Sequence, residues 1–213
     1  MKIQPFETHT QKYEDWFKKN KYAYLSELNA VKELLPEGKG VEIGVGSGRF
    51  AAPLHIRFGL ETSEKMSEIA KKRGINTIEG VAEKLPYKNE EFDYALMVTT
   101  LCFLDDVDKS FKEVYRILKP GGCFINGFVD RESKIGKLYE KNKQQSAFYS
   151  VAKFYSVDEV VEHLTRAGFK DFNYRQTIFF TLDKINSIND VKKGYGEGSF
   201  VVIRARKPRT GKK

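Results

Sequence analysis

The sequence predicts an α/β fold in which a doubly wound, mostly parallel sheet of seven strands carries helices on both faces. Two observations support this prediction. From residue 40 to residue 129, short apolar runs alternate with amphipathic runs of helical periodicity, which is typical of parallel strands joined by crossover helices. The run 92–98 is almost wholly apolar, as expected of a strand that is buried on both sides of a sheet.

The elements follow in order from the N-terminus. Aromatic and aliphatic residues recur every three or four positions in 10–35, which predicts one or two amphipathic helices. Five strands are then expected at 40–44, 55–61, 75–79, 92–98 and 123–129, with helices at 63–73 and 107–118. Beyond them we expect a helical insert (131–155), a helix capped by Ser156 (157–167), two strands (169–180 and 199–206) and an irregular connection (183–197).

The 213 residues suffice for one globular domain with a sizeable core, and we assign residues 1–206 to it. The net charge of +8 comes mostly from the last ten residues, which hold six basic side chains and no acid, so the rest of the chain carries only +2. Residues 207–213 are therefore expected to form a flexible basic tail. Nucleic acid is not an expected partner.

No run approaches the roughly 18 apolar residues of a membrane span, and the first residues lack the apolar core of a secretion signal. The two cysteines, Cys102 and Cys123, show no metal-ligand spacing, so no metal site is expected. These features favour a cytoplasmic protein. Nothing in the sequence indicates an oligomeric state.

A glycine turn follows the first predicted strand, with Gly44, Gly46 and Gly48 at alternate positions. Glycine permits positive φ and a close approach of a ligand to the backbone, and open α/β sheets bind ligands where their strands end. A dinucleotide fingerprint is excluded because Arg49 stands where its third glycine belongs, and the phosphate-binding loop pattern is absent. Glu42 lies in the apolar strand itself, where either a cationic ligand or a nearby Lys or Arg would offset its charge.

At this point the sequence resembles the class I S-adenosylmethionine-dependent methyltransferases, in particular the small-molecule branch similar to the ubiquinone/menaquinone-biosynthesis enzymes. The resemblance spans residues 38–130 and, more loosely, 154–170. It is carried by Glu42–Gly48, by Gly59–Met66, by Gly80–Tyr87 with Phe92-Asp93, by Arg116–Gly122, and by Tyr155-Ser156 through Phe169. It implies a Rossmann-like fold, S-adenosylmethionine as cofactor and S-adenosylhomocysteine as product.

The resemblance also implies which residues bind the cofactor. These are Glu42, Gly44, Gly46, Gly48, Glu61, Thr62, Met66, Ala82, Glu83, Val98 and Thr99. Glu61 would accept hydrogen bonds from both ribose hydroxyls, the alternative being a charge at a helix N-terminus. Met66 would lie against the adenine or serve as a core methionine. Val98 and Thr99 would line the methyl-transfer site.

Two departures from the family pattern stand out. Val81 replaces the Asp that commonly accepts a hydrogen bond from the adenine amino group, so the backbone N–H of Ala82 would have to recognise the ring. Glu83 is a candidate replacement for that acid, and the alternative is a solvated helix charge. The span from Gly48 to Glu61 is also short and contains Pro53, so the first crossover helix must be abbreviated.

No catalytic residue is assigned, since in-line methyl transfer mainly requires alignment and exclusion of water. His9 is kept only as a candidate proton acceptor. Aromatic residues in 10–24 and 131–155 predict a lid over a small aromatic or lipophilic acceptor, with core packing as the alternative. The other functions considered are methylation of RNA or protein, and non-catalytic binding of S-adenosylmethionine.

Overall fold

The computed structural model describes residues 4–209 and contains an eight-stranded sheet of order β3-β2-β1-β4-β5-β8-β6-β7. The first five strands are parallel, and β8, β6 and β7 add antiparallel pairs at one edge. The strands are β1 Gly40–Ile43, β2 Phe58–Glu61, β3 Asn76–Glu79, β4 Phe92–Val98, β5 Leu118–Val129, β6 Lys170–Thr177, β7 Lys192–Lys193 and β8 Phe200–Arg206. The predicted mostly parallel α/β fold is confirmed.

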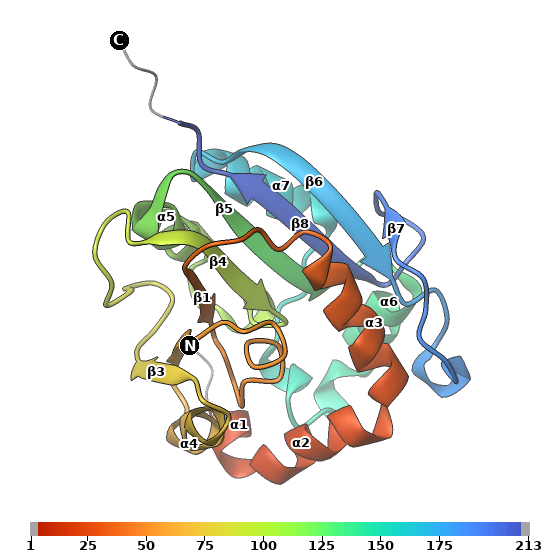
Figure 1. The fold of residues 1–213 in the computed structure, drawn as a ribbon. Coiled ribbons are helices and arrows are strands. Elements are labelled where there is room, and N and C mark those ends of the chain that lie inside the picture. Colours follow the sequence, from red (N-terminus) through yellow and green to blue (C-terminus); the bar gives the residue numbers. More distant parts are fainter. Residues whose placement is uncertain (1–3, 210–213) are drawn as a thin grey trace.

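Helices cover both faces of the sheet (Figure 1). The α-helices are α1 Gln4–Thr8, α2 Thr10–Lys19, α3 Lys21–Lys32, α4 Glu64–Lys72, α5 Val107–Ile117, α6 Lys134–Asn142 and α7 Val157–Arg166. One core lies between the sheet and the apolar stripes of α5 and α7. The other core joins the opposite face to α2, α3, α4 and α6, together with the segment 45–56.

The crossover after β1 is as short as predicted. Residues 45–55 form consecutive turns and no helix, although Phe50, Ala51 and Leu54 are buried like residues of a helix face. A helix of ordinary length cannot fit between Gly48 and β2. The glycine turn therefore leads directly into a compact loop that packs on the sheet.

Strand β5 begins earlier than predicted. Helix α5 ends at Ile117, one residue before its predicted end, because Leu118 already pairs with Phe92. The Lys119-Pro120-Gly121-Gly122 corner belongs to an irregular part of the strand where the register shifts. Gly121 has a positive φ of 83°, and a Cβ on Gly122 would lie 2.8 Å from the Asp93 carbonyl oxygen. The two glycines thus let the strand continue through a bulge where most residues would break it.

Two expectations at the C-terminal edge are corrected. The connection 183–197 is not wholly irregular, because Lys192–Lys193 pairs with β6 and makes the sheet eight-stranded and not seven-stranded. Lys207 does not belong to a flexible tail: it is 8% exposed, and its Nζ donates to the carbonyls of Tyr115 and Leu118 at 3.0 and 2.7 Å. Of the predicted tail, residues 210–213 lie outside the described part of the chain.

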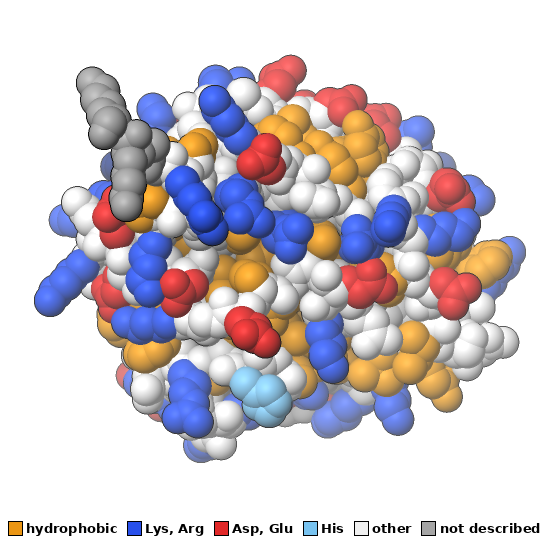
Figure 2. Space-filling view, turned by 45° about the horizontal axis from the view of Figure 1, so that its top comes forward, with side chains coloured by type: hydrophobic (Ala, Val, Ile, Leu, Met, Phe, Trp, Pro, Cys, Tyr) orange, Lys and Arg blue, Asp and Glu red, His pale blue; other side chains and the backbone are white. Residues whose placement is uncertain are grey.

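The surface bears both signs of charge. On the face shown in Figure 2, Asp and Glu side chains stand among the Lys and Arg side chains. Lys and Arg side chains outnumber the acidic ones on this face. None of the helices within residues 4–209 combines the length and the apolar character needed to cross a bilayer.

Candidate active site

The glycine turn lies where the strand order of the sheet reverses. β1 has β2 on one side and β4 on the other, and crossovers in opposite directions leave a crevice at the carboxyl ends of such strands. Gly44 and Gly46 have φ values of 71° and 54°, which glycine adopts freely. A Cβ on Gly44 would overlap the Thr100 side chain, so only glycine fits there. The turn exposes backbone instead of side chains to the crevice.

Glu61, the last residue of β2, fixes this turn from the neighbouring strand. Its Oε2 accepts from the Gly46 amide at 2.7 Å, and its Oε1 accepts from the amides of Thr62 and Ser63 at 3.0 and 2.9 Å. Glu61 is 6% exposed, and burial raises the pKa of its carboxyl group while these amides oppose the shift. Because a carboxylate offers about four acceptor positions, it can still accept from a ligand hydroxyl.

A cavity of ≈ 460 Å³ opens from the glycine turn, within the usual range for small-molecule sites. Its lining joins the turn and the ends of β2 and β4 to the N-terminal helices and the segment after β5. The lining residues include Phe6, Lys12, Tyr13, Trp16, Phe17, Glu27, Gly44, Gly46, Phe50, Glu61, Met66, Val98, Thr99, Thr100, Phe103, Val129, Tyr139, Asn142, Ser146, Phe148, Tyr149 and Leu182.

Six of the eleven residues predicted to bind the cofactor line this cavity. They are Gly44, Gly46, Glu61, Met66, Val98 and Thr99. The other five, Glu42, Gly48, Thr62, Ala82 and Glu83, do not line it. Met66 is fully buried, as the core alternative expected, yet still forms part of the wall.

Gly48 and Glu83 have structural partners of their own. A Cβ on Gly48 would overlap Ile75, so this glycine allows close packing against the residue that precedes β3. The Glu83 carboxylate accepts from the amides of Asp105 and Asp106 at 2.9 and 3.3 Å. This contact ties Glu83 to the start of α5, and its role towards adenine stays a prediction.

Glu42 lies beneath the turn and is only 2% exposed. The Ala51 amide donates to its carboxyl group, while Oε2 has no hydrogen-bond partner among the described residues. Burial raises the pKa of Glu42 well above its ordinary value, and the charge of Glu61 adds to the shift. The unpartnered Oε2 leaves room for the cationic ligand expected from the sequence, so the cofactor role of Glu42 stays a prediction.

A partly buried ion-pair network that the sequence did not predict joins helix α2 to the glycine turn. The Glu14 carboxylate accepts from the Ser47 hydroxyl and from the guanidinium groups of Arg49 and Arg73. Burial opposes ionisation, but these hydrogen bonds lower the pKa of Glu14 to about 2. The Tyr13 hydroxyl beside it lies 3.1 Å from the position of a Cβ on Gly46. The N-terminal segment thus covers the turn.

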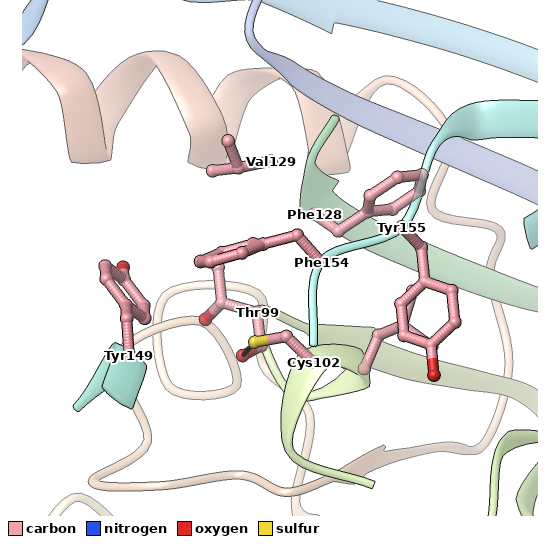
Figure 3. Close-up of a pocket in the computed structure, with 8 residues that line it drawn as sticks. Thr99, Cys102, Phe128, Val129, Tyr149, Phe154 and Tyr155 are labelled. Carbon is pink, nitrogen blue, oxygen red and sulfur yellow. Dashed lines mark hydrogen bonds between the residues drawn. The ribbon is translucent and has the colours of Figure 1, made fainter. Parts of the chain in front are cut away.

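The far end of the cavity is aromatic. Tyr139 and Tyr149 lie with ring centroids 4.7 Å apart, and Phe6 contacts Phe103 at 5.0 Å and Phe148 at 5.4 Å. A smaller apolar recess adjoins this end and shares Thr99, Val129 and Tyr149 with the main cavity. In Figure 3, the Phe154 ring lies between Tyr149 and Tyr155 in this recess. His9, the candidate proton acceptor, is exposed and does not line the cavity.

Glu27 is the other functional candidate that the sequence reasoning missed. It lies on the buried face of α3, whose inward residues recur at helical spacing: Ala23, Ser26, Glu27, Ala30 and Val31. Burial raises its pKa to about 8. A helical projection of 21–32 would have shown one acid inside an apolar stripe, which is the signal that could have found it.

The site fits S-adenosylmethionine better than it fits a phosphate-bearing cofactor. Among residues 4–209, the cavity is lined by two carboxyl groups, Glu27 and Glu61, and by one basic side chain, Lys12. Acids suit a ligand that carries a sulfonium and an ammonium, whereas phosphates need backbone N–H cradles or basic residues. The fold and the site define a class I S-adenosylmethionine-dependent methyltransferase.

Comparisons with known proteins agree. Residues 41–126 match the family model described as a methyltransferase domain. An S-adenosylmethionine-dependent methyltransferase of Thermotoga maritima, described as a possible histamine N-methyltransferase, is 56% identical with a TM-score of 0.95, covering 96% of this chain and 99% of that one. The chain therefore belongs to this methyltransferase family and uses S-adenosylmethionine as methyl donor.

Two further relatives extend the comparison. An uncharacterised protein of Methanocaldococcus jannaschii is 47% identical over 202 residues, which cover 95% of this chain and 98% of the relative. A demethylmenaquinone methyltransferase of Chlorobaculum tepidum is 30% identical over 171 residues, covering 68% of this chain and 71% of the relative. The similarity to quinone-biosynthesis enzymes inferred from the motifs is thus present but distant.

Proposed function

We propose that this enzyme methylates a small aromatic or lipophilic acceptor enclosed between its N-terminal helices and the segment 131–155. The observation that supports this proposal is the continuous cavity that runs from the glycine turn to the aromatic rings of Tyr139, Phe148 and Tyr149. A cofactor at the turn and an acceptor among the rings would share one enclosed space. Apolar enclosure of this kind suits a small molecule.

We propose that the backbone of Gly44 and Gly46 holds the amino-acid end of the cofactor and that Glu61 holds its ribose. Met66 would then lie beside the adenine. S-adenosylmethionine, when bound, supplies an electrophilic methyl group on sulfur. Glu61 has a preorganised acceptor geometry because three backbone amides fix its carboxylate.

The remaining residues align the acceptor and exclude water. Thr99 follows β4 with a φ of 50°, a conformation that costs a threonine about 1–3 kcal/mol and that often occurs at functional sites. Its amide donates to the Gly127 carbonyl at 2.8 Å, which holds the strained turn in place. Thr99 also lines both the cavity and the apolar recess, so it stands between the two compartments. We propose that it orients the reacting atom of the acceptor.

The description of the Thermotoga maritima relative supplies one acceptor to test first. Histamine carries an aromatic ring and an amine, and both would suit a cavity lined by aromatic rings and carboxyl groups. Quinone-like phenols form a second set, because the more distant relatives act in quinone biosynthesis. The two sets differ in charge, so a comparison between them is informative.

The test is transfer of a labelled methyl group from S-adenosylmethionine to fractionated metabolites, to histamine and to phenols, with total RNA and protein as parallel acceptors. Label in a small-molecule fraction, absent with Glu61→Ala, is the expected result. Label only in RNA or protein would overturn the small-molecule proposal. Binding of S-adenosylhomocysteine without turnover on any acceptor would favour a non-catalytic protein instead.

A further inference from the structure

Glu27 is a buried acid without a partner, and it lies in the wall of the cavity. The Glu27 residue is only 7% exposed and lines the cavity. Within residues 4–209, no hydrogen bond or ion pair to its carboxyl group occurs, and no charge of another group contributes to its raised pKa. A carboxyl group in such a wall needs a partner from the cavity, and a cationic ligand would supply one.

The groups around Glu27 are aromatic. Burial raises the pKa of Tyr139 to about 12, and the charge of Glu27 adds to that shift. Burial also raises the pKa of Tyr149, with Tyr139, Cys102 and Glu27 contributing in turn. Trp16, Phe17 and Phe148 line the same cavity. An acid surrounded by aromatic faces is the environment that recognises an ammonium group, since the ring faces attract cations as well.

Glu27 differs from the carboxylates of the cofactor end in the groups on which its charge acts. The carboxylates beside the glycine turn, Glu42, Glu61 and Glu14, follow burial as causes of the raised pKa of Tyr13. None of them contributes to the raised pKa of Glu27, whose own charge contributes to the raised pKa values of Tyr139 and Tyr149 and, as the smallest contribution, of Tyr24. Lys12, the basic residue of the lining, is exposed and does not pair with Glu27. The place of Glu27 in the cavity wall, with a charge that acts chiefly on Tyr139 and Tyr149, favours the acceptor end.

We propose that Glu27 binds the cationic nitrogen of the acceptor, and that aromatic molecules bearing an ammonium group are the substrate class of this enzyme. This inference rests on the proposed small-molecule function and deepens it. Glu27 acts as a specificity-determining residue: its carboxylate pairs with the ammonium, while the rings of Tyr139 and Tyr149 pack against the apolar body. A neutral acceptor of the same shape would leave the acid unpaired in the wall.

The test compares 2-phenylethylamine with 2-phenylethanol, which share a ring and chain length but differ in charge. Binding of each to the full-length protein saturated with S-adenosylhomocysteine is measured by calorimetry near pH 8, where the acid and the amine can both ionise. We expect the amine to bind at least about tenfold more tightly than the alcohol. In Glu27→Gln that ratio should fall towards one.

Glu37→Gln is the matched control, because Glu37 is exposed in the loop after α3 and its substitution removes the same charge. It should keep the wild-type ratio. The inference is overturned if wild type binds both probes equally, if it fails to bind the amine at about 10 mM, or if Glu27→Gln keeps the preference.

The cofactor measurement separates this inference from the proposed function. Glu27→Gln should bind S-adenosylhomocysteine as tightly as wild type does. If its affinity for S-adenosylhomocysteine falls instead, Glu27 serves the cofactor and the inference is overturned. If wild type binds S-adenosylhomocysteine and methylates small molecules but prefers neutral ones, the proposed function stands and the role of Glu27 fails.

Discussion

Replacing Glu27 by glutamine should change how the stability of the free enzyme depends on pH. Burial raises the pKa of Glu27 from the ordinary 4.5 to about 8 in the folded state. The folded protein therefore holds a proton that the unfolded chain has lost between these pH values, and its stability falls as pH rises through that window. At 1.36 kcal/mol for each pH unit, the full loss is at most about 5 kcal/mol.

This magnitude is large against a typical unfolding free energy of about 5–15 kcal/mol. The glutamine side chain of the Glu27→Gln variant is neutral at every pH, so the variant should resemble wild type near pH 5 and exceed it in stability near pH 8.5 by up to about 5 kcal/mol. Other titrating groups are common to both proteins and cancel in the difference. Glu37→Gln should show no such pH-dependent gain, because Glu37 is exposed.

Urea unfolding of the cofactor-free proteins at the two pH values measures the effect, with the fluorescence of Trp16, the single tryptophan, as the signal. Equal m-values would show that the compared states are the same. If the free-energy difference between wild type and Glu27→Gln changes by less than about 1 kcal/mol between the two pH values, Glu27 is not held neutral by burial. The reasoning about its place in the cavity would then fail.

Three more predictions concern the cofactor end. Glu61→Ala should bind S-adenosylhomocysteine at least about tenfold more weakly by calorimetry, since it loses charge-assisted bonds of about 1.5–3 kcal/mol each; unchanged affinity would exclude the ribose role. Gly44→Ala should lose at least about 2 kcal/mol more stability in urea than Gly74→Ala, which shares the positive φ but has free space around it; equal losses would refute the predicted overlap with Thr100. Glu14→Gln should speed amide exchange in α2, whereas Asp15→Asn, exposed on the same helix, should not. Equal exchange rates in the two variants would show that the ion-pair network does not hold α2 in place.

The alternating α/β part of the fold could be predicted because its signals are local. The apolar run 92–98 and the glycine that ends the helix before β3 depend only on periodicity and backbone conformation. The edge of the sheet was harder to predict. Lys192–Lys193 has no strand periodicity and is extended only because β6 offers it a partner. Lys207 is held by the carbonyls at the end of α5, a contact between distant parts of the sequence.

The site residues also differ in whether their signals are local or depend on tertiary contacts. Gly44 and Gly46 lie in one short motif and Glu61 in another, each at the end of a strand, so their place in the cavity was predictable. Glu14 and Glu27 act through contacts with segments more than 20 residues away, and their neighbours in sequence are ordinary helix residues. Only the tertiary structure distinguishes these two acids from solvated ones.

Helix α2 and residues 143–151 both cover the cavity, but different contacts hold them in place. This difference affects how an acceptor enters. Helix α2 is held to the glycine turn by the ion pairs of Glu14, which are directional and partly buried. Residues 143–151 form two short 3-10 turns, and Phe148 contacts the N-terminal segment through ring packing with Phe6 and His9. Ring contacts tolerate sliding far better than a charged network does. We therefore expect entry of the acceptor by displacement of 143–151, while α2 stays over the cofactor.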